Sequence, residues 1–332
     1  MSELLKPLKS GNLELKNRLV MPPMATSKSQ GDGKVSQDIL DYYKEKLKGR
    51  YISLIIIEHS FINKQGKASN GQLSVSDDSD IEGLKKLAQV IQSNGSKAVM
   101  QINHAGGAAS KDVTGTIPVG PSAVANPRFK DKVVPEELSK EDIKVIINDF
   151  AYAALRVKEA GFDGVEIHSA HGYLLDQFFS PLSNKRRDEY GGNVNNRIRI
   201  HLEVINAVKE AVGSDFPILL RLGAADYIEG GAVIEDSIIA AKEFEKAGVN
   251  IIDIPGGFLG YVIPNIAEQG YFSPLSEEIN KNISIPVILT GGIIESQAAE
   301  KLLQEGKADL IGVGRAILKD SNWAKRAIES LK

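Results

Sequence analysis

Short apolar runs alternate with amphipathic segments along the whole chain. Eight of these runs are rich in Val, Ile and Leu, at residues 18–21, 52–57, 98–102, 164–167, 218–222, 251–254, 287–289 and 310–313. Strands that are buried on both faces have this near-continuous apolar character, because helices cover both sides of a parallel sheet. The pattern therefore predicts eight parallel strands.

The segments between the runs have the spacing of helices, and residues 139–161 show it most clearly. Ser139 can cap a helix together with Asp142, and Gly161 can end it in the left-handed conformation. Apolar residues fall on one face between them, at Ile143, Ile146, Ile147, Phe150, Ala154 and Val157. Eight strand–helix units predict an α/β fold of the (β/α)8 TIM-barrel type, with residues 1–332 as one domain. An open doubly wound sheet has the same periodicity and stays the alternative.

Two predicted connections are longer than the others, at residues 103–137 and 169–196. Both follow strands, and the loops after barrel strands carry the active sites of TIM-barrel enzymes. Long ordered loops in compact domains are commonly lids or binding loops. We therefore expect these two segments to cover a site.

The composition excludes several classes of function. The 332 residues are 42% hydrophobic and 25% charged, and the net charge of -3 gives no basic surface for nucleic acid. No cysteine is present, which excludes disulfides, thiolate nucleophiles and cysteine-bound iron–sulfur clusters. Charged residues interrupt the apolar stretches of residues 1–20, which is typical neither of a signal peptide nor of a membrane span. We expect a cytoplasmic protein that binds neither nucleic acid nor membranes.

The segment His168-Ser-Ala-His171-Gly-Tyr173 directly follows the predicted strand at 164–167. Two imidazoles can donate hydrogen bonds to one carbonyl or anion, and the phenol of Tyr173 can transfer a proton. A lone His at such a position is usually structural, but three such groups together at a strand exit favour a catalytic site. A His-x-x-His metal site is the other interpretation, although no nearby Cys or acidic set completes a tetrahedral zinc site.

Two glycine turns follow the last two predicted strands, Thr290-Gly291-Gly292-Ile293 and Gly312-Val-Gly314-Arg315. Glycine lets the backbone approach phosphate oxygens, and arginine adds a bidentate charge. Either turn alone is common in barrel loops, but the pair after strands seven and eight is typical of a phosphate site. The pair indicates a phosphorylated ligand or cofactor.

Six motifs form a recognisable set along the chain. They are Met21-Pro-Pro-Met-Ala-Thr26, Gln101-Ile-Asn-His-Ala-Gly106, His168-Ser-Ala-His171-Gly-Tyr173, Phe179-Ser-Pro-Leu-Ser-Asn184, Asp188-Glu-Tyr-Gly-Gly192 and Asn196-Arg197. The set resembles the Old Yellow Enzyme family of FMN-dependent oxidoreductases over nearly the whole chain. The resemblance implies a TIM barrel that binds FMN across its top, is reduced by NADH or NADPH, and is reoxidised by an α,β-unsaturated carbonyl compound.

The resemblance also assigns residues to the flavin. The residues implied are Pro23, Met24, Ala25, Thr26, His59, Gln101, Arg221, Gly291, Gly292, Gly314 and Arg315. Thr26 would place its hydroxyl near the carbonyl beside N5, Gln101 would bond the pyrimidine edge, and Arg221 would stabilise negative charge near N1. Gly292, Gly314 and Arg315 would take the phosphate. For Arg221 the structural alternative is a pair with a barrel carboxylate such as Glu58 or Glu166, because a buried guanidinium needs an anionic partner.

Three positions depart from the family pattern. Thr26 stands where short members often carry a flavin-tuning Cys, and Lys28 stands where they carry a substrate-contacting Tyr. His59 replaces a small residue that packs against the ring. Redox tuning by sulfur is therefore excluded, and the pocket is expected to be more polar. Larger members append iron–sulfur and nucleotide-binding domains, whereas a short single-domain form is expected here.

The resemblance implies two half-reactions at one pocket. Nicotinamide delivers hydride to flavin N5, which then passes it to the β-carbon of a substrate bound by His168 and His171, with Lys28 nearby. Tyr173 would protonate the α-carbon. Two other functions stay open, an amine dehydrogenase or demethylase on the same barrel and a flavin-free phosphate-binding barrel such as an aldolase. The choice between NADH and NADPH and the oligomeric state, homo-oligomers included, also stay open.

Overall fold

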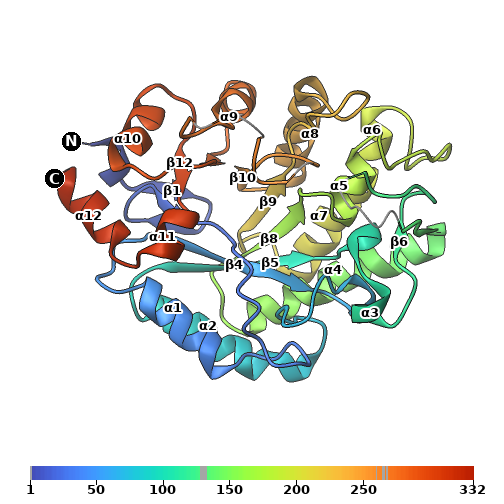
Figure 1. Cartoon of the computed structure of the whole chain (residues 1–332), viewed down its shortest axis with the longest axis horizontal. Helices are drawn as coiled ribbons and strands as arrows, with labels where there is room; N and C mark the ends of the chain where they lie inside the picture. The colour runs from blue at the N-terminus through green and yellow to red at the C-terminus, as the bar shows by residue number, and fades with distance from the viewer. Residues whose placement is uncertain (1, 128–132, 259, 264–265, 267) are drawn as a thin grey trace.

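A computed structural model shows a closed barrel of eight parallel strands surrounded by helices (Figure 1). It describes residues 2–127, 133–258, 260–263, 266 and 268–332. The barrel strands are β3 (Leu19–Met21), β4 (Leu54–Phe61), β5 (Lys97–Asn103), β8 (Gly164–Ser169), β9 (Ile218–Leu222), β10 (Ile251–Ile254), β11 (Val287–Thr290) and β12 (Leu310–Gly312). Each predicted strand is present, and pairing of β12 with β3 closes the sheet. The TIM-barrel prediction is confirmed over the open sheet.

Helices cover the outside of the barrel, as Figure 1 shows. The longer ones are α1 (Gln37–Lys46), α2 (Ile81–Gln92), α4 (Lys140–Glu159), α7 (Arg199–Val212), α8 (Ile234–Ala247), α9 (Ser273–Asn280), α10 (Ser296–Gln304) and α12 (Trp323–Ser330). In α4, Ser139 and Asp142 form the predicted capping box. Gly161, with φ of 81°, follows the helix in the left-handed conformation that glycine adopts without strain.

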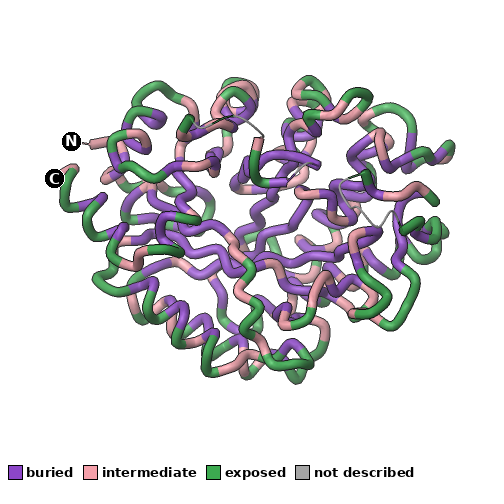
Figure 2. Tube along the Cα trace, viewed as in Figure 1, coloured by how far each residue is buried: buried purple, intermediate pink, exposed green. Residues whose placement is uncertain are grey.

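An apolar cluster fills the lower part of the barrel. Its members are Leu13, Leu15, Val20, Leu54, Ile56, Val99, Leu219, Ile251, Ile288 and Leu310. Leu13 and Leu15 come from the antiparallel hairpin of β1 (Leu8–Ser10) and β2 (Leu13–Leu15). Since Leu54, Ile251 and Leu310 are the first residues of their strands, this hairpin closes the N-terminal end of the barrel. Figure 2 shows the buried chain gathered around the strands and the exposed chain on the outer helices.

The two long connections contain short elements of their own. The first holds η4 (Gly106–Ala108), α3 (Lys111–Thr114) and a two-stranded parallel sheet of β6 (Val119–Gly120) and β7 (Glu136–Glu137), while residues 128–132 lie outside the described residues. The second holds α5 (Leu174–Phe179) and leads into α6 (Val194–Arg197). Both follow barrel strands as predicted. No helix within the described residues combines the length and apolar character that crossing a bilayer requires.

Candidate active site

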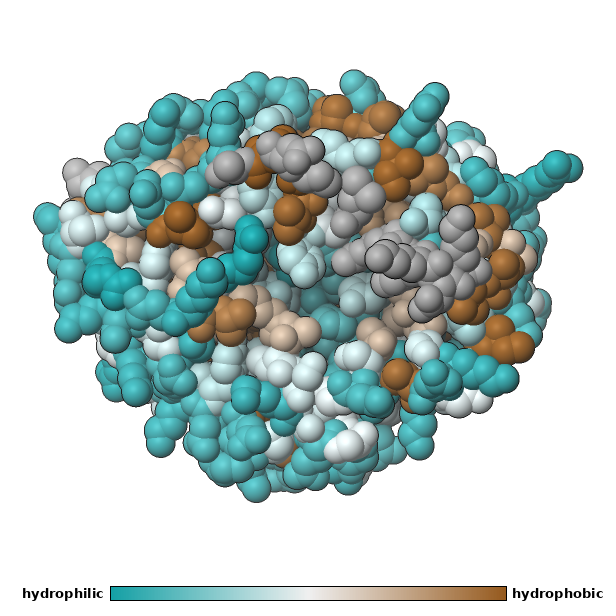
Figure 3. Space-filling model, in the orientation of Figure 1, coloured by the Kyte–Doolittle hydropathy of each residue, from teal (hydrophilic) through white to brown (hydrophobic). Residues whose placement is uncertain are grey.

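The barrel interior changes from apolar to polar toward the C-terminal ends of the strands. Residues two apart on a strand point to the same face, so each of four strands places an apolar and then a polar residue inward. These pairs are Val99 and Gln101 on β5, Leu219 and Arg221 on β9, Ile251 and Asp253 on β10, and Ile288 and Thr290 on β11. Above this polar layer lies a cavity of about 370 Å³, seen as a hollow near the centre of Figure 3.

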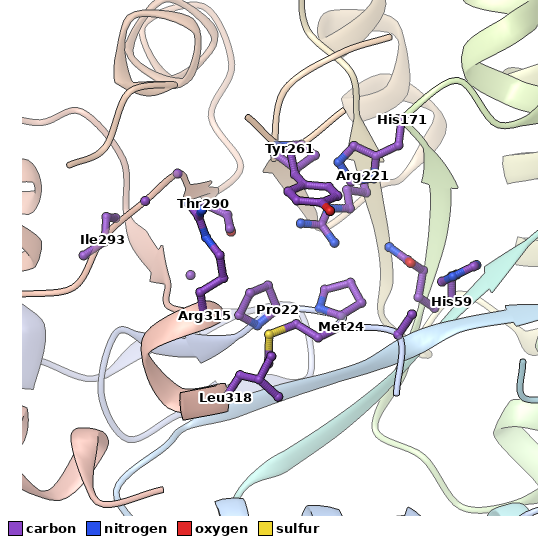
Figure 4. A pocket seen from close by; sticks show the side chains of 18 of the residues that line it. Pro22, Met24, His59, His171, Arg221, Tyr261, Thr290, Ile293, Arg315 and Leu318 are labelled. Carbon is purple, nitrogen blue, oxygen red and sulfur yellow. The ribbon is translucent and has the colours of Figure 1, made fainter. Parts of the chain in front are cut away.

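Most of the predicted site residues line this cavity. They are Pro23, Met24, Ala25, His59, Gln101, His168, His171, Tyr173, Arg221, Gly291, Gly292, Gly314 and Arg315. In Figure 4, Arg315 and Thr290 stand on one side of the cavity, and Arg221, His171 and His59 stand on the other. Residues from many strands and loops thus meet in one space, which is what a ligand site at the C-terminal face of a barrel requires.

Thr26 and Lys28 are not among the described residues that line the cavity. The Thr26 hydroxyl donates to Oε1 of Glu58 at 3.0 Å, and its backbone N–H donates to Oε2 of the same carboxylate. Burial raises the pKa of Glu58 to about 7, while the bonds from Thr26 favour its charged form. Lys28 is exposed. The flavin role of Thr26 and the substrate role of Lys28 therefore stay predictions, and the geometry gives Thr26 a different partner.

The imidazoles and the phenol that follow β8 form one aromatic cluster. The ring centroid of His168 lies 5.2 Å from that of His171 and 5.2 Å from that of Tyr173, and both ring pairs are nearly perpendicular. His168 is buried at the end of β8, whereas His171 and Tyr173 are half-buried in the turn before α5. The three groups thus converge on the cavity as predicted. Within the described residues, no group of three His, Cys, Asp or Glu side chains is arranged to hold a metal ion.

The turn that carries His171 is held by buried hydrogen bonds. His171 has φ of 64°, a left-handed conformation that is uncommon for residues with a side chain. The neighbouring Gly172 donates its N–H to Asp176 Oδ2 at 2.7 Å, and its carbonyl accepts from Gln177 Nε2 at 2.6 Å and Asn126 Nδ2 at 3.1 Å. Asn126 comes from the first long connection. These bonds hold the backbone of the turn from which the His171 side chain projects.

A bulge in β4 aims His59 into the cavity. The pairing of β4 with β5 shifts register between Ile57 and Ser60, so His59 rather than Glu58 lines the cavity. Its Nδ1 lies 2.9 Å from Nε2 of Gln72, an amide whose orientation is set because its Oε1 accepts from the N–H of Ala68. Nδ1 therefore accepts, and neutral His59 carries its proton on Nε2. Burial, and secondly the charge of Arg221, lower the pKa of His59 to about 4.

The ring of His59 also contacts Tyr173, the predicted proton donor. Its ring stacks on Tyr173 with centroids 5.3 Å apart and an angle of 25° between the planes. His59 thus adds a polar imidazole to the cavity lining, and this imidazole stays uncharged near neutral pH.

Arg221 is buried at the floor of the cavity and points toward its middle (Figure 4). Its Nε lies 3.1 Å from Oδ2 of Asp253, close enough for an ion pair although not aligned for a hydrogen bond. Arg221 thus has the barrel carboxylate partner that the structural alternative named, but this partner is Asp253 on the next strand and not Glu58 or Glu166. Glu166 instead accepts a hydrogen bond of 2.7 Å from Nε2 of Gln101.

Two fully buried carboxyl groups thus share one guanidinium in this layer. Burial and, secondly, the charge of Asp253 raise the pKa of Glu166 to about 8, against the opposing effect of Arg221. Burial also raises the pKa of Asp253, against the opposing effect of Arg221. Two charged carboxylates beside one cation would leave a net charge in the barrel interior, which is costly. The arrangement favours one protonated carboxyl at neutral pH, and Glu166 is the one without the ion pair.

The two glycine turns meet at the opposite end of the cavity. A Cβ on Gly312 would lie 2.0 Å from Thr290 Oγ1, and a Cβ on Gly292 would lie 2.4 Å from the ring of Tyr271, so only glycine fits at either position. Gly292 also has φ of 65°. Arg315 begins the short helix α11 (Arg315–Lys319) beside them. The glycine turns and the cationic side chain thus meet at one end of the cavity, and their role in binding phosphate stays a prediction.

The sequence pattern of the NADH:flavin oxidoreductase / NADH oxidase family matches residues 3–332. The chain belongs to this family. It is 43% identical over 325 residues to an NADH oxidase of Thermoanaerobacter brockii, which covers 96% of this chain and 50% of that protein. It is 39% identical over 331 residues to an NADPH dehydrogenase of Bacillus subtilis (strain 168), which covers 99% of this chain and 95% of that protein.

Solved structures agree with this membership. The Old Yellow Enzyme homologue of Zymomonas mobilis superposes with a TM-score of 0.86 at 27% identity, over 99% of this chain and 93% of that one. The resemblance to the Old Yellow Enzyme family is thus confirmed. The chain spans about half the length of the Thermoanaerobacter brockii relative and nearly the full length of the other two proteins.

Several residues of this family member's cavity were not predicted from the sequence. They are Pro255, Tyr261, Tyr271, Ile294 and Leu318. Pro22, Thr290, Ile293 and Gly312 also line the cavity, and they belong to the quoted motifs, which gave them no individual role. Tyr261 and Tyr271 follow β10, in a segment without periodic pattern. Asp253, an acid inside the apolar run 251–254, was a signal that could have identified the partner of Arg221.

Proposed function

We propose that the protein is an FMN-dependent NAD(P)H oxidoreductase that reduces the activated C=C bond of α,β-unsaturated carbonyl compounds. One observation carries the proposal: His168, His171 and Tyr173 converge in the same cavity as Arg221 and the glycine turns with Arg315. Groups that can polarise a carbonyl and donate a proton thus face groups that can hold a phosphorylated anionic ring system. Membership in a family named for NADH and flavin supports both partners.

The residues present fit FMN at each end of the cavity. At one end, Gly292 and Gly312 leave no room for side chains but let a phosphate approach the backbone, and Arg315 supplies charge. At the other end, the Arg221 guanidinium pairs with Asp253 through Nε and faces the cavity, where it can stabilise a developing negative charge. Gln101 would present its carbonyl oxygen to the ring, because Glu166 accepts from its amide nitrogen. Pro23, Met24 and Ala25 would pack along the ring.

The protein residues would bind, polarise and protonate the substrate. FMN, when bound, supplies the carrier that takes a hydride from NADH or NADPH and gives it to the β-carbon of the substrate. His168 and His171 donate hydrogen bonds to the substrate carbonyl, which draws electron density away from the β-carbon. Tyr173 gives its phenolic proton to the α-carbon, and solvent later restores that proton. The C=C bond thus gains one hydride and one proton, which balances the reduction.

The rigid surroundings of these groups suit this role. The hydrogen bonds of Gly172 with Asp176, Gln177 and Asn126 hold His171 in its left-handed backbone conformation, so its direction is set before substrate binds. Neutral His59 stacks on Tyr173 without placing a positive charge beside the phenol. Lys28 would contact substrate only from outside the cavity lining.

We also propose that the protein acts in the cytoplasm, either as a monomer or as a homo-oligomer.

The two half-reactions, measured separately, test the proposal. The purified protein should be yellow and release FMN rather than FAD. Anaerobic stopped-flow mixing with NADH or NADPH should bleach the flavin, and a panel of enones should restore its colour. A protein that binds no flavin after reconstitution would instead be the phosphate-binding barrel of another class. Bleaching by amines but not by nicotinamides would favour the amine dehydrogenase.

A further inference from the structure

The segment before α9 is docked on the first glycine turn of the cavity. The N–H of Gly270 donates to the carbonyl of Gly291 at 2.6 Å. Oε1 of Gln269 accepts from the N–H groups of Ile294 and Glu295 at 2.7 and 2.8 Å. Two backbone donors just before α10 are therefore already engaged within the protein. The positive charge beside the glycine turns is supplied by the side chain of Arg315, which also lines the cavity.

Tyr271 lies between the glycine turns and Arg315. Its ring covers Gly292, where an added Cβ would lie 2.4 Å from Cε1, and packs edge-on against Phe272 with centroids 4.7 Å apart. Its hydroxyl accepts a hydrogen bond of 3.0 Å from Nη2 of Arg315 and donates one of 2.7 Å to the carbonyl of Tyr261. Because the hydroxyl proton goes to the carbonyl, its lone pairs are directed to the guanidinium.

These contacts orient the guanidinium of Arg315 without saturating it. Arg315 is exposed, and a long exposed side chain loses considerable rotamer entropy when it is held in one place. The bond to Tyr271 uses one of the five guanidinium N–H donors, so the others stay available for an anion. The half-buried phenol, fixed by Phe272 and by the Tyr261 carbonyl, is the more rigid partner. An arginine that is already in position binds its anion with less loss of freedom.

We propose that Tyr271 is a positioning residue for phosphate recognition, which holds Arg315 over the glycine turns and so makes the protein favour FMN over riboflavin. The inference rests on the proposed function, because it takes FMN as the ligand. Riboflavin has the same ring system without the phosphate, so it reports on the remainder of the cavity alone. Comparison of the two ligands therefore isolates what Tyr271 does for the phosphate.

The experiment titrates the full-length chain, stripped of flavin, with FMN and with riboflavin, and follows the quenching of flavin fluorescence. Tyr271→Phe keeps the ring and removes the hydroxyl. It should weaken FMN binding roughly three- to tenfold, the effect of one net hydrogen bond, and leave riboflavin binding unchanged. Tyr227→Phe is the matched control, since Tyr227 packs on the same Phe272 ring and is not among the described cavity residues. It should change neither affinity.

Arg315→Ala completes a double-mutant cycle. If Tyr271 acts through Arg315, adding Tyr271→Phe to Arg315→Ala should weaken FMN binding no further. Additive losses would overturn the proposal, and so would an unchanged FMN affinity in Tyr271→Phe. Equal losses for FMN and riboflavin would also overturn it, because Tyr271 would then contact the part of the flavin that both ligands share. A wild-type protein that binds neither flavin would overturn the proposed function itself. Equal wild-type affinities for FMN and riboflavin would overturn the phosphate site.

Discussion

The lower and upper layers of the barrel interior come from the same strands but have opposite character. The lower layer, the apolar cluster around Leu219, Ile251 and Ile288, is fully buried and contains no polar side chain. The upper layer contains Gln101, Glu166, Arg221, Asp253 and Thr290. Two residues along a strand, about 7 Å, separate the two layers. The apolar lower layer therefore stabilises the fold, whereas the upper layer holds buried charges that cost stability but can act on a ligand.

If the two layers have these separate roles, a substitution above the upper layer should change the rate of reaction without changing the stability of the fold. Tyr173→Phe should slow reoxidation by a weakly activated enone by about 10² to 10⁴, the usual contribution of a positioned general acid. Reduction by the nicotinamide should be almost unchanged, because that step needs no proton from this side chain. Separate stopped-flow measurements of the two half-reactions check both statements, with Tyr152→Phe on the exposed face of α4 as the control.

The choice of acceptor sharpens this test. A strongly electron-poor acceptor gives a carbanion-like product that can wait for a proton from water, so Tyr173→Phe should slow it much less. Equal slowing of both half-reactions with both acceptors would mean that Tyr173 only packs against its neighbours.

A change in the lower layer should have the reverse effect. Leu219→Ala removes a fully buried side chain and should lower the free energy of unfolding by about 2–5 kcal/mol. The rate constants of the folded fraction should stay the same, because Leu219 lies below the cavity lining. Urea unfolding followed by circular dichroism measures the loss, and Ile239→Ala, on an exposed position of α8, should cost far less. Altered substrate kinetics in the folded variant would show that the layers are coupled.

The end of the cavity with the glycine turns and Arg315 should contribute to the affinity for FMN rather than to the free energy of unfolding or to the rate of hydride transfer. Arg315→Ala should weaken FMN binding by about 1.5–3 kcal/mol, the range for a hydrogen bond to a charged group. Since Arg315 is exposed, unfolding of the flavin-free chain should barely change. Fluorescence titration with FMN measures the effect, and Lys319→Ala at the other end of α11 removes the same charge as a control. If both variants bind FMN as wild type does, the phosphate lies elsewhere.

The sequence predicted the lower layer better than the upper one. Runs such as 218–222 are apolar because their strands are buried on both faces, and this local pattern was enough to place all eight strands. Closure was not visible, because it depends on pairing between β12 and β3 at opposite ends of the chain. The glycine turns and the His168 to Tyr173 segment could be identified because both follow predicted strands and contain residue types suited to binding phosphate or polarising a carbonyl.

The parts of the site that were missed depend on contacts between distant segments. The Asp253 partner of Arg221 is set by strand register, which a single sequence does not give. Tyr271 and Arg315 lie 44 residues apart in the chain, with β11 and β12 between them. A tyrosine in an irregular segment also gives the same sequence signal as a core residue. Thr26 was placed by its motif, but the Glu58 carboxylate that takes its hydroxyl comes from the next strand.

The last expected effect is a change of stability with pH, and it concerns the proton that we assign to Glu166. Its folded-state pKa of about 8 lies above the ordinary value of 4.5, so between these values the folded protein keeps a proton that the unfolded chain has lost. Stability should therefore fall as pH rises through this window, by at most about 1.4 kcal/mol per pH unit. Glu166→Gln resembles the protonated acid and cannot ionise, so its decline should be shallower. Some decline should persist, because the pKa of Glu58 is also raised, to about 7. Urea midpoints from pH 5 to 9 measure the slopes, with the exposed Glu210→Gln as control. If Glu166→Gln and wild type decline in parallel, Glu166 is ionised in the folded protein, and the assignment of the proton to Glu166 is wrong.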